Sequence, residues 1–246
     1  MSRIPGNLQA VHARIAAAAA KVSRQTQEIS LLAVSKTFGA DAVLQAIAAG
    51  QRDFGENYLQ EALEKIEEVK RLQNNDAMKG DAAPLLKWHF IGPIQSNKTR
   101  PLAEHFDWVH SIDREKIAQR LADQRPAGLP PLNVCIQVNI SGEASKSGVP
   151  PDDVVTLAQT IAARPQLRLR GLMAIPGPAS DFEAQRRPFH ALGVLYQRLQ
   201  DAGLPVDTLS IGMSDDLEAA IAEGATIVRV GSAIFGTRDH VEPAYS

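Results

Sequence analysis

The feature that most constrains the fold of this chain is a regular alternation of short apolar segments with longer amphipathic segments, which begins near residue 30. Short apolar runs bounded by glycine or polar residues are typical of buried strands, and amphipathic segments of ten or more residues are typical of helices. A strand–helix unit repeated eight times in 246 residues predicts an α/β fold, a single (β/α)8 TIM barrel. A doubly wound open sheet is the alternative architecture. The strands that we predict are Leu31–Ser35, Arg52–Gly55, Trp88–Gly92, Trp108–Ile112, Asn133–Ile140, Leu169–Ala174, Thr208–Gly212 and Ile227–Val230.

The segments between these strands predict helices, and Gly50, Gly203 and Gly224 stand where three of them should end. An extra N-terminal helix, over about Leu8–Arg24, is expected because it contains a run of alanines with strong helix propensity. No stretch resembles a linker, so residues 1–246 are expected to form one domain. The other predicted helices are about Ala40–Ala49, Tyr58–Leu72, Lys98–Glu104, Arg114–Asp123, Asp152–Ala163, Asp181–Ala202 and Asp215–Glu223.

The charge balance and the cysteine content exclude several classes of function. The 26 basic and 28 acidic residues are scattered, which argues against nucleic acid or a membrane as a partner. Cys135 is the only cysteine, so no internal disulfide is expected, and the start of the chain lacks the apolar core of a signal peptide. The six histidines show no metal-binding spacing. We therefore expect a cytoplasmic protein without a metal site.

Lys36 stands directly after the first predicted strand, between Ser35 and Thr37. Burying a lysine charge costs several kcal/mol unless the group is paired or loses its proton, and a neutral lysine is a nucleophile toward aldehydes. Taken alone, Lys36 is better explained as a strand-end lysine that extends its ammonium group to water.

Other polar or pocket-lining residues follow later strands at the same predicted end of the barrel, where active sites of this fold lie. The loops after the last two strands commonly bind phosphate in such barrels, and here both contain small residues and lead into helices. Ser214 could instead be a helix N-cap. A lysine that faces a phosphate site across one barrel mouth indicates a receptor for pyridoxal 5′-phosphate. The candidate site residues at this end of the barrel are Lys36, Asn57, Met173, Ser214, Arg229, Gly231 and Ser232.

Seven motifs follow one another from about residue 31 to 236, and they are Ala33–Thr37, Phe54–Tyr58, Trp88–Lys98, Val138–Gly148, Gly171–Ile175, Gly212–Asp216 and Val228–Gly236. Together they resemble the YggS/PROSC family of pyridoxal-phosphate homeostasis proteins. The resemblance implies a barrel like the N-terminal domain of alanine racemase, a fold-type III pyridoxal-phosphate protein. It implies that Lys36 forms the aldimine, that Ser214 and the Gly231–Ser232 amides hold the phosphate, and that Arg229 lies near the pyridine nitrogen. It also implies that Asn57 and Met173 line the ring pocket.

Arg229 helps to distinguish a cofactor carrier from an enzyme. A guanidinium is always protonated and cannot accept the proton of the pyridine ring, so the ring stays neutral and is a poor electron sink. Alanine racemases take a second base, a tyrosine, from a separate C-terminal domain, for which this sequence has no evident counterpart. We therefore expect a monomeric, non-catalytic carrier that buffers the cofactor or delivers it to apo pyridoxal-phosphate enzymes. The alternatives are a minimal racemase with Tyr58 or solvent as second base, and a Schiff-base aldolase that uses Lys36 on a sugar phosphate.

Overall fold

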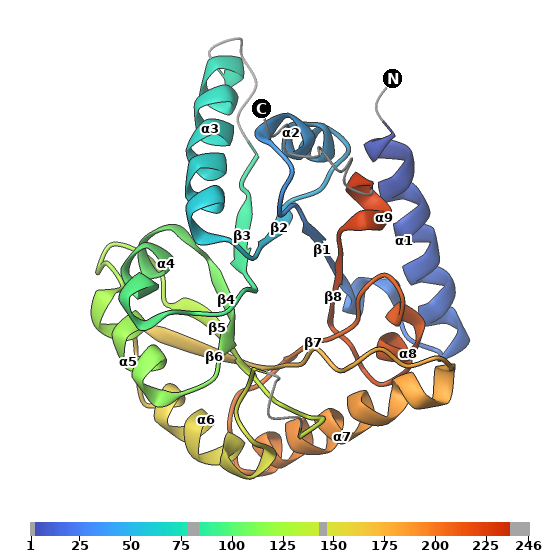
Figure 1. Ribbon diagram of the computed structural model, residues 1–246, viewed down its shortest axis with the longest axis vertical. Coiled ribbons are helices and arrows are strands. Elements are labelled where there is room, and N and C mark those ends of the chain that lie inside the picture. The colour runs from blue at the N-terminus through green and yellow to red at the C-terminus, as the bar shows by residue number, and fades with distance from the viewer. Residues whose placement is uncertain (1–2, 78–83, 143–146, 237–246) are drawn as a thin grey trace, which may run out of the picture.

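The computed structural model describes residues 3–77, 84–142 and 147–236, and within them eight parallel strands close into one barrel. Neighbouring strands in the sequence are neighbours in the sheet, and β8 pairs with β1 to complete the ring (Figure 1). This confirms the predicted barrel and excludes the open sheet. The strands are β1 Ser30–Val34, β2 Asp53–Glu56, β3 Lys87–Phe90, β4 Trp108–Ile112, β5 Leu132–Gln137, β6 Leu167–Met173, β7 Thr208–Ser210 and β8 Ile227–Val230.

Helices surround the barrel and cover its outer face (Figure 1). The predicted helices are confirmed to within a few residues, apart from α3, which continues to Ala77 where a loop was expected after Leu72. Two short helices follow the last strands, and the structure adds three single 3-10 turns. The α-helices are α1 Ile4–Lys21, α2 Ala40–Ala48, α3 Leu59–Ala77, α4 Thr99–His105, α5 Glu115–Gln124, α6 Val154–Ala162, α7 Phe182–Asp201, α8 Leu217–Ala222 and α9 Ser232–Phe235.

The extra helix α1 packs against the end of the barrel chain. It lies alongside α8 and α9, and Asn7 Nδ2 donates a hydrogen bond to Ile234 O of α9 at 2.8 Å. Its buried face includes Leu8, Val11 and Ile15, and burying each such side chain stabilises the fold by about 1.5–3 kcal/mol. Helix α1 therefore fixes the position of the segment that follows β8.

Two apolar clusters lie on opposite faces of the strands. The larger fills the space between the helices and the outer face of the barrel. The smaller lies on the inner face and consists of Leu32, Val34, Ile91, Trp108, Cys135, Met173 and Ile227. Alternate residues of one strand face opposite sides, so Leu31 and Ala33 belong to the outer cluster while Leu32 and Val34 belong to the inner one.

Polar side chains share the barrel interior with the inner apolar cluster. His89, His110, Ser210 and Arg229 are each at most 3% exposed. Because buried polar groups are stable only when they have hydrogen-bond partners, the partners of these four residues matter for the function of the barrel. Within the described residues, no helix is long and apolar enough to cross a bilayer, and no group of three or more metal-ligating side chains gathers.

Candidate functional site

Lys36 lies just beyond β1, at the carboxyl end of the barrel. Its side chain is half-buried, and Thr37 after it has a left-handed backbone with φ of 68°. Ser35 N donates to Gly55 O of β2 at 3.0 Å, which extends the pairing of the two strands up to the residue before the lysine. The backbone pairing of β1 with β2 thus continues up to Ser35, and the chain turns at Lys36. The strand-end position predicted for this lysine is confirmed.

A buried ion pair stabilises the turn that contains Lys36. Lys65 of α3 donates from Nζ to Glu56 Oε1 and to Ser35 O, both at 2.7 Å. Ser35 Oγ also donates to Glu56 Oε1 at 2.6 Å, and Glu61 accepts from both Lys65 Nζ and Thr37 N. The residues on both sides of Lys36 are therefore fixed by one cluster of charges.

Burial is the dominant influence on Glu56. Its side chain is fully buried, and this desolvation raises the pKa of the carboxyl, while the charge and hydrogen bond of Lys65 act in the opposite direction. Glu56 Oε2 has no hydrogen-bond partner among the described residues. A buried carboxylate in this setting depends on Lys65, because an unpaired buried charge is strongly destabilising.

Asn57 lies next to Lys36 because β1 and β2 are paired. The register joins Val34 to Gly55, and Lys36 and Asn57 follow these paired residues two positions later in the chain. Asn57 Oδ1 is buried and has no hydrogen-bond partner among the described residues. A Cβ added at Gly92 would lie 2.1 Å from Asn57 O, so only glycine lets the loop after β3 approach Asn57 this closely. An unsatisfied buried polar atom at this place favours a ligand that supplies its partner.

The start of α9 lies on the other side of Lys36. Ala33 is paired with Val230, so Gly231 and Ser232 follow β8 where Lys36 follows β1. A Cβ at Gly231 would lie 3.2 Å from Val34 O. The rings of Phe38 and Phe235 are stacked with 5.2 Å between their centroids, which packs the Lys36 turn against α9. Closure of the barrel therefore brings the lysine and the predicted phosphate loop together.

Ser214 lies in a turn after β7, and the prediction that it could be an N-cap is wrong. Helix α8 begins at Leu217 with Asp216 as its N-cap, and Asp216 Oδ1 accepts from Met213 N at 2.6 Å. The reason is that Gly212, with φ of 89°, starts a tighter turn that delays the helix. Ser214 Oγ makes no hydrogen bond within the described segments, so its hydroxyl group is free to bind a ligand.

Sequence reasoning did not identify Arg14 as part of this turn. Arg14 of α1 donates from Nη1 to Ser214 O at 2.6 Å, and its Nε and Nη2 form a bidentate pair with Glu218 at 2.6 Å. The extra N-terminal helix thus holds the Ser214 turn in place. No local pattern in the sequence could predict this contact, because the two residues are 200 positions apart.

Arg229 and Met173 lie in the barrel interior, below the residues of the rim. Met173 is fully buried and belongs to the inner apolar cluster. Arg229 donates from Nη1 to Ser210 O and Oγ and from Nη2 to Ala174 O. Burial lowers the pKa of its guanidinium to about 10, partly offset by the charge of Asp216. Arg229 therefore remains a cation at neutral pH, held largely by neutral groups.

Lys65 was also missed, although the sequence contained a signal. Ala62, Ile66 and Val69 form the buried face of α3, and Lys65 lies on that face. A lysine at an apolar position of a helix indicates a buried acidic partner, which the sequence could not identify as Glu56.

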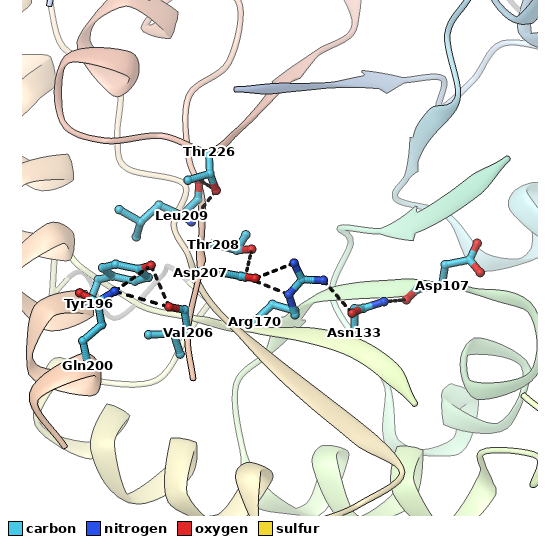
Figure 2. Close-up of polar contacts among 10 residues, drawn as sticks. All are labelled: Asp107, Asn133, Arg170, Tyr196, Gln200, Val206, Asp207, Thr208, Leu209 and Thr226. Carbon is cyan, nitrogen blue, oxygen red and sulfur yellow. Dashed lines mark hydrogen bonds and ion pairs between the residues drawn. The ribbon is translucent and has the colours of Figure 1, made fainter. Parts of the chain in front are cut away.

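The other end of the barrel contains a cavity of about 530 Å³ lined by residues at the starts of the strands. Figure 2 shows polar contacts around part of this region: Arg170 forms a bidentate pair with Asp207 at 2.8 Å and donates to Asn133 Oδ1. The Arg170 guanidinium also lies 4.6 Å from the centroid of the Trp108 ring. These contacts satisfy one another, and this end of a (β/α)8 barrel mainly serves stability. We therefore place the candidate site at the opposite end, with Lys36.

Replacing Lys65 should show how much its buried ion pair contributes to the free energy of unfolding, compared with an exposed ion pair of the same helix. We expect Lys65→Met to lower the free energy of unfolding by about 3–5 kcal/mol in urea denaturation, because it leaves Glu56 buried and unpaired. The control is Lys70→Met in the same helix, whose ion pair with Glu67 is exposed and should contribute less than about 1 kcal/mol. The double variant Glu56→Gln/Lys65→Met should recover part of the loss. Equal effects of the two single variants would contradict the importance of the buried pair.

Comparison with known proteins identifies the family of this chain. The family model of the alanine racemase N-terminal domain matches residues 6–239. A pyridoxal phosphate homeostasis protein of Pseudomonas aeruginosa is 60% identical over 99% of this chain and 100% of its own length, and that of Escherichia coli K12 is 54% identical over 98% and 99%. The structure of PipY from Synechococcus elongatus with PLP bound is 36% identical, covers 90% of this chain and 100% of PipY, and has a TM-score of 0.76. The chain therefore belongs to the alanine racemase N-terminal domain family and, within it, to the YggS/PROSC group of pyridoxal phosphate homeostasis proteins.

Proposed function

We propose that this protein binds pyridoxal 5′-phosphate at the carboxyl end of its barrel and serves the intracellular homeostasis of vitamin B6. The observation that carries the proposal is the packing of the Lys36 turn against the start of α9, through Gly231 and the Phe38–Phe235 stack. It sets an amine beside a loop of small residues with free amide groups, the two features that an aldehyde phosphate requires. The PLP-bound structure of the relative PipY supports the same assignment.

The residues of the site suit the separate parts of the cofactor. Lys36 Nζ would bond to the aldehyde carbon, and the hydroxyl groups of Ser214 and Ser232 with the amides of α9 would hold the phosphate. Asn57 would supply a polar contact to the ring substituents, since its buried Oδ1 lacks a partner. Met173 would line the ring pocket, and Arg229 would lie near the ring nitrogen.

Arg229 favours a carrier over a broad amino-acid enzyme. Bound pyridoxal phosphate supplies an aldehyde and an electron sink, and the sink is strongest when the ring nitrogen is protonated. Arg229 can only donate hydrogen bonds, so it would keep that nitrogen unprotonated. The reversible bond to Lys36 suits a protein that stores the cofactor and releases it to apo enzymes, and we propose that it acts as a monomer.

Lys36 should be the residue that captures the cofactor. After incubation with pyridoxal phosphate and borohydride reduction, peptide mass mapping should find the pyridoxyl group on Lys36, because Lys36 follows β1 beside the segment that leads from β8 into α9. Lys36→Ala should lose the visible absorbance of the bound cofactor.

The matched control for this experiment is Lys116→Ala, which removes an exposed lysine of α5 and should bind as the wild type does. A pyridoxyl adduct on another lysine at equal yield, or full retention of cofactor by Lys36→Ala, would overturn the assignment of Lys36.

The phosphate contacts can be tested with a pair of ligands. We expect Ser214→Ala/Ser232→Ala to weaken the binding of pyridoxal phosphate about 10- to 100-fold, because each hydrogen bond to a charged group contributes about 1.5–3 kcal/mol and water replaces part of it. The affinity for pyridoxal, which has no phosphate, should stay close to that of the wild type. Equal losses for the two ligands, measured by absorbance titration, would show that the serines do not contact the phosphate.

A racemase-type activity is the second candidate, and one observation favours it. Tyr58, the first residue of the helix predicted over Tyr58–Leu72, lies just before α3 and is 52% exposed. Its hydroxyl group is therefore accessible near the mouth that holds Lys36, as a second base would have to be.

The carrier and the racemase differ in the loss of substrate hydrogen. For the carrier we expect negligible exchange of α-deuterium from a panel of amino acids in the loaded protein, measured by mass spectrometry. Efficient exchange of any one amino acid that is lost in Tyr58→Phe, with cofactor binding retained, would establish the racemase instead.

A further inference from the structure

A chain of hydrogen bonds runs through the barrel interior from Asp53 to Arg229. Asp53 Oδ1 lies 3.1 Å from His89 Nε2, His89 Nδ1 lies 2.9 Å from His110 Nε2, and His110 Nδ1 lies 2.8 Å from Ser210 Oγ. Arg229 Nη1 lies 2.9 Å from the same Ser210 Oγ. The five residues come from β2, β3, β4, β7 and β8.

The two ends of this chain lie in different environments. The Asp53 side chain is 30% exposed, and both Asp53 and His89 line the cavity at the amino-terminal ends of the strands. His110 and Ser210 are fully buried, and Arg229 is 3% exposed. The chain thus connects the solvent-accessible cavity at the amino-terminal ends of the strands with the buried Arg229 in the barrel interior.

The carboxylate end and the neutral rings together set the direction of the hydrogen bonds. An ionised carboxylate can only accept, so His89 Nε2 donates to Asp53. A neutral His89 then accepts at Nδ1 from His110 Nε2, and a neutral His110 accepts at Nδ1 from Ser210 Oγ. Ser210 Oγ keeps lone pairs that accept from Arg229, which can only donate, so in this arrangement each histidine carries its proton on Nε2.

Burial supports the neutral state of the two rings. Desolvation lowers the pKa of His89, against the opposing influence of Asp53 and Asp107. It lowers the pKa of His110 well below the usual range, and the neighbouring His89 and Arg229 act in the same direction. A neutral imidazole with one donor and one acceptor is the form that can continue a directed chain.

We propose that His89, His110 and Ser210 are positioning residues, which hold the Arg229 guanidinium in one orientation through a directed hydrogen-bond chain anchored on Asp53. Ser210 is the link that joins the imidazoles to the arginine, because its Oγ contacts both. The consequence for the cofactor ring rests on the proposed function, whereas the chain itself is a property of the protein without ligand.

Ser210→Ala breaks this chain by removing a single oxygen atom, and Thr208→Val is the matched control. Thr208 belongs to the same strand and is 3% exposed, but its hydroxyl group donates to Asp207 and lies outside the chain. Both variants remove a buried hydroxyl group, so a general effect of repacking the barrel would appear in both.

The first measurement uses protein without cofactor, labelled with 15N in histidine and arginine. Two-dimensional NMR of the wild type should show His89 and His110 neutral with the proton on Nε2, assigned by loss of signals in His89→Gln and His110→Gln. Hydrogen exchange of the Arg229 guanidinium should be about tenfold faster in Ser210→Ala, since one bond to a charged group is lost. It should be unchanged in Thr208→Val. A proton on Nδ1 of either ring, or unchanged exchange in Ser210→Ala, would overturn the proposal.

The second measurement is the visible absorbance maximum of bound pyridoxal phosphate, which reports the environment of the ring. It should shift in Ser210→Ala and stay constant in Thr208→Val. An equal shift in both variants, or in neither, would contradict a specific link between the chain and the ring. If no cofactor bound to the wild type, the proposed function would fail, while the NMR measurement would still decide whether the chain exists.

Discussion

The pairing of β8 with β1 is the interaction on which the rest of the site depends. It closes the sheet, and its register joins Leu32 to Arg229 and Ala33 to Val230. The segments beyond these pairs, with Lys36 on one strand and Gly231 and Ser232 on the other, must then lie side by side. Residues separated by almost 200 positions in the sequence thus become neighbours through backbone hydrogen bonds, before any side chain contributes.

Three basic residues near this junction have three different environments, which suit three different roles. Lys36 is half-buried in a turn, where its amine can reach a ligand. Lys65 is buried and makes contacts to Glu56, Glu61 and Ser35, so its charge stabilises the turn. Arg229 is buried among carbonyl oxygens and the Ser210 hydroxyl group. A guanidinium tolerates this environment because its charge is delocalised and its donors are fixed in a plane.

The sequence was most informative where local periodicity determines structure. All eight strands were predicted in the correct order, since each is a short apolar run that must be buried. Errors arose where a turn decides the outcome: Gly212 delays α8, so that Asp216 and not Ser214 is the N-cap, and Tyr58 precedes its helix and stays exposed. The Glu56–Lys65 pair, the contact of Arg14 with Ser214 and the histidine chain were not predicted, because each joins different elements of the barrel.

The sequence by itself determined the barrel, the position of Lys36 at a strand end and the small residues of the loops after β7 and β8, because these follow from hydrophobic periodicity and from the backbone demands of turns. Only the tertiary structure decided which groups surround these residues. The buried Glu56–Lys65 pair behind the lysine and the directed chain from Asp53 to Arg229 exist because closure brings side chains from distant strands and helices within hydrogen-bond distance. The physical reason is that periodicity is a property of neighbouring residues, whereas satisfying a buried charge requires partners that only the folded chain assembles.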